Sequence, residues 1–241
     1  MTRLARVVAV SLTLVALAGC GAEPAEPSPR AVTSAEAQVL AVSRFLNFDA
    51  RTRPFETTYT LSGVDVTMRG WVDYVAELGY ASVSGEFGTE AVLWTDSSIG
   101  AIPRDAGADG YPVLPIPTLD DPEWQIEALD AGSSALGALV ATISALGSDR
   151  PDNPLLLQQS GALWLRTDVI GDTAVTVFGA PPSDAPVTDS GPPDVEAVTL
   201  RLWLDADGLL RRAEVFVNDG WTSVDFPDIP GPELSIPERT G

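Results

Sequence analysis

The chain has 241 residues with 14 basic and 34 acidic side chains, which give a formal net charge of −20 at pH 7. A surface this acidic repels polyanions, so the composition argues against DNA or RNA binding. Histidine is absent and every basic residue is an arginine, which excludes serine–histidine, cysteine–histidine and serine–lysine catalysis, Schiff-base chemistry and histidine-based metal sites within this chain.

The first 20 residues have the three parts of a bacterial export signal. Arg3 and Arg6 precede an apolar run at 7–18, which is shorter than the roughly 20 residues of a membrane-spanning helix. Leu-Ala-Gly at 17–19 followed by Cys20 resembles the lipobox of bacterial lipoproteins. That resemblance implies diacylglycerol transfer to the Cys20 thiol, cleavage before it, and acylation of the new N-terminus with a group such as palmitate. We therefore expect a lipid anchor at the extracytoplasmic face of the cell membrane.

The rest of the chain divides into a tether and one domain. Residues 1–19 are the expected signal peptide, 20–33 a flexible tether rich in proline and glutamate, and 34–241 a single domain long enough to bury a core. Cys20 is the only cysteine, so the domain has to be stabilised by core burial rather than by disulfides. Arginine without lysine is typical of GC-rich genomes and points to an actinobacterial source.

The first half of the domain predicts one helix followed by strands. Thr33 and Glu36 have capping-box spacing, and apolar residues recur at helical intervals up to position 46. Alternating apolar and polar residues then indicate strands at 55–61 and 64–75, with Gly70 as a bulge or bend. Further strands are expected at 79–85, 90–95 and 98–103, before an irregular glycine- and proline-rich stretch at 104–119.

A second helix is expected from Asp121-Pro122 to Gly147. Aspartate followed by proline is typical of a helix start, and glycine is typical of the position after a helix end. The middle of this segment, residues 131–141, consists mostly of small and weakly polar residues. These residues either leave room for a ligand beside the helix or allow the helix to pack closely on a sheet.

The last part of the chain predicts a short helix and then strands again. The helix is expected to begin at Asn153-Pro154 and to reach Gly161. Strands are expected at 162–170, 173–178, 198–205, 209–217 and 221–226, with Asp205–Gly208 as a hairpin turn. The sum is an α+β pattern, a large and mostly antiparallel sheet with two to three helices.

This order of elements resembles the actinobacterial lipoproteins of the LppX/LprG type, which share a half-barrel fold with the LolA and LolB lipoprotein carriers. The stretches that carry the resemblance are 64–73, 161–179 and 202–212. The resemblance implies a bent antiparallel sheet, a half-barrel, with two to three helices on its concave side and an apolar cavity for acyl chains of lipids or lipoglycans. The loop at 180–196 and the strong acidity are departures from the family.

Six residues are candidate ligand contacts. Four lie on the apolar face of the second helix and two are tryptophans of the predicted strands: Leu136, Leu139, Val140, Ile143, Trp71 and Trp94. The alternative for the tryptophans is core packing and cross-strand pairing. No motif indicates a catalytic residue, a metal site or a cofactor.

Three hypotheses on function follow. The first is a membrane-anchored extracytoplasmic lipoprotein that binds or carries lipid or lipoglycan acyl chains, without enzymatic activity. The second is a non-enzymatic scaffold or interaction lipoprotein of the cell envelope with a filled core and an unidentified protein partner. The third is a hydrolase that uses carboxylates alone, although no particular pair of acids stands out.

Overall fold

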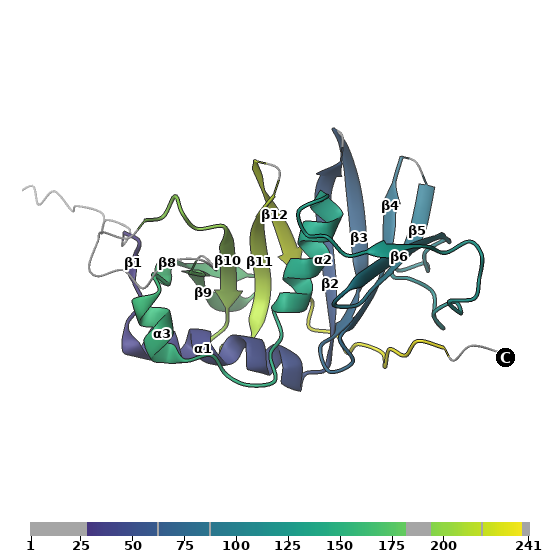
Figure 1. Ribbon diagram of the computed structural model, residues 1–241. Coiled ribbons are helices and arrows are strands. Elements are labelled where there is room, and N and C mark those ends of the chain that lie inside the picture. Colours follow the sequence, from purple (N-terminus) through teal and green to yellow (C-terminus); the bar gives the residue numbers. More distant parts are fainter. Residues whose placement is uncertain (1–27, 62, 87, 182–193, 218, 238–241) are drawn as a thin grey trace, which may run out of the picture.

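The computed structural model describes residues 28–61, 63–86, 88–181, 194–217 and 219–237 (Figure 1). Its strands form one antiparallel sheet in the order β1-β8-β9-β10-β11-β12-β2-β3-β4-β5-β6-β7. None of the helices in these ranges has the length and hydropathy needed to cross a membrane. The elements are β1 (Arg30–Ala31), α1 (Ser34–Asp49), β2 (Thr52–Leu61), β3 (Val64–Asp73), β4 (Leu78–Gly85), β5 (Gly88–Trp94), β6 (Ser98–Pro103), β7 (Gln125–Ala128), α2 (Ala135–Ala145), α3 (Pro154–Gln159), β8 (Leu163–Ile170), β9 (Thr173–Gly179), β10 (Leu200–Leu204), β11 (Leu210–Val217) and β12 (Gly220–Asp225).

The predicted capping box at the start of α1 is confirmed. Thr33 is the N-cap, its hydroxyl accepts a hydrogen bond from the Glu36 backbone N–H, and the Glu36 carboxylate accepts from the Thr33 N–H at 2.8 Å. Arg30 adds two hydrogen bonds to the same carboxylate, at 2.6 and 2.7 Å. The residues just before the domain are therefore joined to its first helix.

Strands β2 to β6 form the predicted meander, with one correction at Gly70. This residue pairs with Phe55 on β2 and with Ala81 on β4 without any register shift, so β3 has no bulge there. A Cβ atom at position 70 would overlap the Tyr80 carbonyl and Ala81. Glycine is needed at this position because the neighbouring strand approaches closely, which leaves no space for a Cβ atom.

The second helix begins later than the sequence indicates, at Ala135 instead of residue 122. Residues 125–128 instead pair with β6 as the edge strand β7, and Trp124 is buried with its indole N–H donating to the Thr118 carbonyl at 3.2 Å. Ser134 is the N-cap, and its hydroxyl accepts from the Gly137 N–H at 2.9 Å. The helix start predicted at Asp121-Pro122 is wrong. The pairing of residues 125–128 with β6 and the burial of the Trp124 indole outweigh a local helix-start signal.

The helix and the strands of the last third of the chain lie where the sequence predicts them, whereas the predicted loop at 180–196 falls mostly outside the described residues. Asn153 caps α3, and its side chain accepts from the Leu155 N–H at 3.0 Å. The β10–β11 hairpin turns at Gly208, whose φ is +91°. Asp205 closes this turn by accepting hydrogen bonds from the Asp207 and Leu209 N–H groups at 3.1 and 3.0 Å.

The sheet bends around α2. This helix contacts both β11 and β4, which lie four places apart in the sheet order, and Figure 1 shows it lying across the middle of the sheet. Leu40 of α1 and Leu139 of α2 belong to one core cluster with the inner face of the sheet. Two smaller clusters lie elsewhere, around Tyr80 and around Trp203. The α+β half-barrel class expected from the sequence is confirmed.

Candidate functional site

Two cavities of similar size border helix α2, each at a different part of the helix. Cavity A has a volume of about 410 Å³ and is lined by Tyr59, Leu61, Val66, Val83, Gly85, Gly88, Glu90, Val92, Ile99, Gly100, Ala101, Gln125, Ile126, Glu127 and Leu136. Cavity B has a volume of about 430 Å³ and is lined by Leu40, Ser43, Arg44, Asn47, Thr142, Ala145, Leu146, Asp152, Asn153, Leu156, Leu157, Ser160, Ala180, Pro181, Leu200, Leu202 and Leu210. Both volumes fall within the range of roughly 300–1,000 Å³ typical of ligand pockets.

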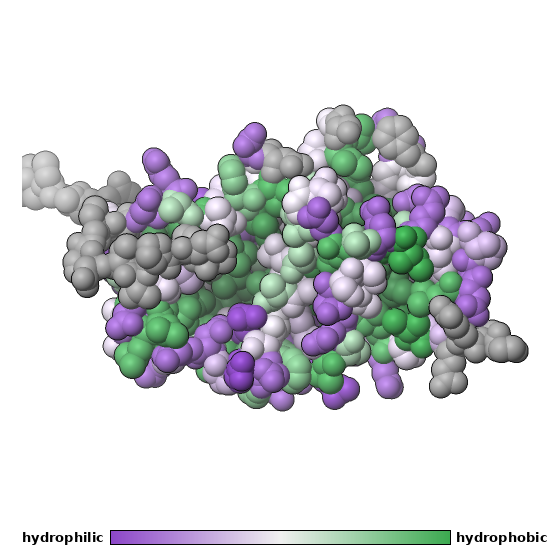
Figure 2. Space-filling view, viewed as in Figure 1, coloured by the Kyte–Doolittle hydropathy of each residue, from purple (hydrophilic) through white to green (hydrophobic). Residues whose placement is uncertain are grey.

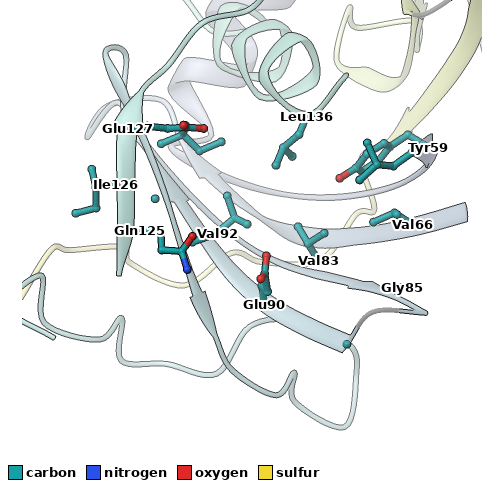
Figure 3. Close-up of a pocket in the computed structure, with 15 residues that line it drawn as sticks. Tyr59, Val66, Val83, Gly85, Glu90, Val92, Gln125, Ile126, Glu127 and Leu136 are labelled. Atoms are coloured by element: carbon teal, nitrogen blue, oxygen red, sulfur yellow. The ribbon is translucent and has the colours of Figure 1, made fainter. Parts of the chain in front are cut away.

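The wall of cavity A is built from cross-strand partners. Val83 lies opposite Glu90, and Val92 lies opposite Ala101, which in turn pairs with Gln125. Because side chains directly opposite each other in an antiparallel sheet point to the same face, these pairs form rows along the cavity wall. Figure 3 shows Val83 and Val92 rising from the strands while Leu136 reaches down from α2. The cavity is therefore closed by valines on the sheet side and by a leucine on the helix side.

Polar groups are spread around cavity A. Glu90 projects from β5 and Gln125 and Glu127 from β7, while Tyr59 lies on the opposite side with its hydroxyl pointing into the space (Figure 3). Burial, together with the charge of Glu90, raises the pKa of Tyr59 to about 12. The phenol is therefore a neutral hydrogen-bond donor at physiological pH. An apolar wall beside a donor and two carboxylates suits an amphiphile whose polar end carries hydroxyl groups or a positive charge.

The polar groups of cavity B bond to the protein itself. Arg44 donates to the Ala145 carbonyl at 2.9 Å and to Asp152 at 3.1 Å. The Asn47 amide donates to the Leu146 carbonyl at 2.8 Å. Since these groups are already hydrogen-bonded, the leucines and alanines decide the character of the cavity, which is apolar.

The structure separates the six candidate ligand contacts. Leu136 alone among them lines one of the two cavities. Trp71 stacks on Tyr111 at 5.0 Å between ring centroids and packs against the Tyr80 cluster. The other four are fully buried in the main core: Leu139, Val140, Ile143 and Trp94.

Trp94 serves as a link between the sheet and α2. Its indole N–H donates to the Ser144 hydroxyl at 2.9 Å, and its ring meets Phe55 edge to face at 6.0 Å between centroids. The small residues of α2 therefore allow the helix to pack closely on the sheet along its buried part, which is the second of the two alternatives that the sequence left open. Room for a ligand is found beside its first turn and its last turn.

Sequence reasoning missed most of the cavity residues. Tyr59, Val83 and Val92 lie in correctly predicted strands, and their alternation marks them as one face of a sheet. The alternation does not indicate whether that face packs against another element or borders a cavity. Cavity B had no local signal at all, because it needs α1, α3 and β10 to come together from distant parts of the chain.

Metal ligands are not grouped in the part of the chain that the structure describes: no set of three or more acidic, histidine or cysteine residues is arranged to hold an ion. Three further hollows have volumes of about 460, 700 and 710 Å³. Charged residues border all of these spaces, but the linings of cavities A and B have the largest apolar share, so these two are the apolar candidates.

Comparison with known proteins gives structural likeness only. No family model matches the chain, and no curated protein matches its sequence. LprF from Mycobacterium bovis is similar at a TM-score of 0.43 and 12% identity, covering 88% of this chain and 100% of its own. Lipoprotein LppX from Mycobacterium tuberculosis is similar at 0.43 and 14%, covering 83% and 98%. An outer membrane lipoprotein-sorting protein domain from Vibrio parahaemolyticus is similar at 0.27 and 9%, covering 80% and 92%. The resemblance predicted from the sequence is thus confirmed as a resemblance, at low identity.

Proposed function

We propose that this chain is a lipid-anchored protein of the extracytoplasmic face of the cell membrane that holds acyl chains of a lipid or lipoglycan in cavities A and B. The observation that carries the proposal is the pair of apolar cavities, about 410 and 430 Å³, beside one packed helix. Each methylene removed from water contributes about 0.8 kcal/mol, so a chain of a few methylenes already binds appreciably. The proposal assigns no catalysis to the chain.

The charge around cavity A favours some head groups over others. Glu90 and Glu127 line it, and the whole chain has a formal charge of −20. A phosphate or free carboxylate placed beside these side chains would be repelled. The ligand we favour therefore has a head group that carries hydroxyls and no negative charge, as in a glycolipid or lipoglycan.

Native mass spectrometry tests the binding. The chain is expressed with Cys20→Ala in a lipid-containing host, and we expect adducts of acyl-lipid mass on the purified protein. Leu136→Trp fills cavity A and should remove or reduce the adduct. Val113→Trp adds the same side chain at an exposed site in the 104–119 segment and should leave it unchanged. A clean protein mass, also after incubation with a membrane lipid extract, would contradict the proposal.

Cell fractionation tests the anchor separately. Cys20 lies outside the described residues, and its role rests on the lipobox-like motif at 17–20. We expect the wild-type chain in the membrane fraction and Cys20→Ala in the soluble fraction. Retention of the Cys20→Ala variant in the membrane would show that the anchor lies elsewhere.

A scaffold or interaction lipoprotein with a filled core is the second candidate. The observation that favours it is the complete burial of Leu139, Val140 and Ile143, which pack α2 tightly on the sheet. The two candidates differ in the state of cavities A and B. A protein that stays free of lipid under every loading condition, while capturing an envelope protein through a defined surface, would support the scaffold.

A further inference from the structure

Two neighbouring leucines on α3 face the solvent. Leu155 is 65% exposed and Leu156 is 53% exposed, whereas Leu157 packs against the main core. Figure 2 shows hydrophobic side chains gathered where α3 lies, at the left of the molecule. A contiguous exposed apolar patch can mark a site of contact with a protein or a membrane. We call Leu155 and Leu156 the α3 surface.

The α3 surface lies where the chain enters the domain. Strand β1 pairs with β8, and the Val32 N–H donates to the carbonyl of Ala162, which closely follows α3, at 3.3 Å. The guanidinium of Arg30 lies 4.7 Å from the centre of the Trp164 ring. Figure 1 shows β1, α3 and the start of α1 at the same end of the molecule.

The length of the chain before β1 keeps this end close to the anchor. Nine residues lie between Cys20 and Arg30, and at about 3.3–3.6 Å per residue the ten steps from one to the other span at most roughly 36 Å. The end of the molecule that carries α3 is therefore the end held near the leaflet in which the lipid on Cys20 would sit.

The two ends of the sheet differ in how their charged side chains are paired. Near β1 and α3, Arg30 pairs with Glu36, Arg44 with Asp152, and Arg166 with Asp168, while Asp194 and Glu196 remain exposed. At the other edge of the sheet, β5 and β7 carry Glu90 and Glu127, and among the described residues no ion pair involves β5, β6 or β7. Carboxylates that are paired with arginine repel an anionic membrane less than unpaired ones.

We propose that the α3 surface docks on the lipid bilayer that holds the anchor. Leu156 also lines cavity B, so docking sets the mouth of this cavity against the leaflet and gives an acyl chain a path that avoids water. This inference rests on the proposed function, because it takes the anchor on Cys20 and the lipid in cavity B as given. The occupant is the membrane, not a protein.

Site-specific labelling tests the docking. The thiol of Cys20 is consumed by lipidation, so an introduced cysteine is the one reactive thiol in the full-length lipidated chain. Leu156→Cys and Val113→Cys are labelled with an environment-sensitive fluorophore in phosphatidylcholine vesicles. Val113 is the control, since it is 40% exposed, lines neither cavity, and lies beside β4, where its carbonyl accepts a hydrogen bond from the Tyr80 hydroxyl.

We expect the label at position 156 to shift to the blue on vesicles and to be protected from a water-soluble quencher several-fold better than the label at 113. Equal quenching at both positions would overturn the inference. Equal protection at both positions would overturn it too, because the molecule would then lie on the membrane without a preferred end.

A second variant separates docking from binding. Leu155→Gln changes the leucine of the α3 surface that does not line cavity B, so it should slow the transfer of bound lipid to vesicles several-fold, while the amount of lipid that the protein holds stays the same. An unchanged transfer rate would count against docking. If the wild type holds no lipid at all, the proposed function fails, whereas the fluorescence labels still report whether α3 meets the membrane.

Discussion

At the scale of single residues, the carboxylate of Glu36 joins β1 to α1. It accepts hydrogen bonds from the Thr33 N–H and from the Thr33 hydroxyl at 2.8 and 2.9 Å, and it forms a two-point ion pair with Arg30. The hydrogen bonds from Arg30, followed by those from Thr33, lower the pKa of Glu36 to about 2. Glu36, in the first turn of α1, thus also holds β1 in place.

Glu36→Gln should destabilise the domain at neutral pH by about 1 kcal/mol, the usual worth of a helix cap. Because the pKa in the folded state lies below the ordinary value, the ionised carboxylate stabilises the fold fully above about pH 5 and loses this contribution as the pH falls toward 2. Urea unfolding at pH 7 and at pH 2 measures the difference. A gap between wild type and variant that stays constant across this range would contradict the ion-pair argument.

Glu90 is the second residue whose charge should matter. It lines cavity A opposite Val83 and its charge contributes to the raised pKa of Tyr59. Glu90→Gln should increase the affinity for a fatty acid several-fold, because a carboxylate ligand then meets one repelling charge fewer. Affinity for an uncharged monoacylglycerol should change little.

Calorimetric titration with the two ligands measures the effect of Glu90→Gln. Glu196→Gln provides the control, since it removes the same charge from an exposed site that does not line either cavity. Equal gains in fatty-acid affinity for both variants would mean that net charge decides, and not the place of Glu90 in the cavity.

Strand β4 shows how one glycine controls packing at the scale of elements. Gly79 is the cross-strand partner of Trp94, and a Cβ atom at position 79 would overlap the indole ring. The missing side chain allows Trp94 to lie flat across β4 and to reach Ser144 of α2. The position of α2 on the sheet therefore depends on a residue without a side chain.

Gly79→Ala should destabilise the domain by about 1–3 kcal/mol, because the added methyl group displaces Trp94 from a filled core. Gly85→Ala on the same strand is the matched control, since its Cβ atom would meet its nearest neighbour at 3.4 Å, an ordinary contact. Urea unfolding of both variants measures the free energies. Similar stabilities for the two variants would contradict the packing role of Gly79.

Local signals explain which elements the sequence predicts well. The Thr33 capping box, the Asn153-Pro154 start and the Asp205–Gly208 turn are each decided by hydrogen bonds within a few residues, and all three are found. The sequence predicts the start of α2 about one dozen residues too early. Residues 125–128 pair with β6 instead, and no local pattern indicates this partner. Cavity B could not be predicted for the same reason, since its walls come from elements that are far apart in the sequence.

The arrangement of two cavities around α2 predicts a stoichiometry for the whole molecule. Cavity A borders the first turn of the helix at Leu136, and cavity B borders its last turn at Ala145. Buried residues between these turns, such as Leu139, keep the two spaces apart. Each cavity should therefore bind its own acyl chain.

We expect two molecules of a single-chain monoacylglycerol to bind each wild-type protein and one to bind Leu136→Trp. Native mass spectrometry of the titrated samples counts the bound molecules directly. Loss of both ligands in Leu136→Trp would show that the cavities form one continuous space. A single ligand on the wild type would show that one cavity is not used.

The order of the strands has a consequence for the folding of the chain. Strands β2 to β7 and β8 to β12 are two meanders of sequence neighbours, and they meet where the Thr57 hydroxyl donates to the Ser223 carbonyl across 166 positions of sequence. Local meanders close short loops and form quickly, whereas this junction has to wait for the end of the chain. Strand β1 likewise has no partner until β8 has been made. A chain exported from its N-terminus would thus be attached to the membrane by its anchor alone at first. The domain would approach the membrane only after folding is complete.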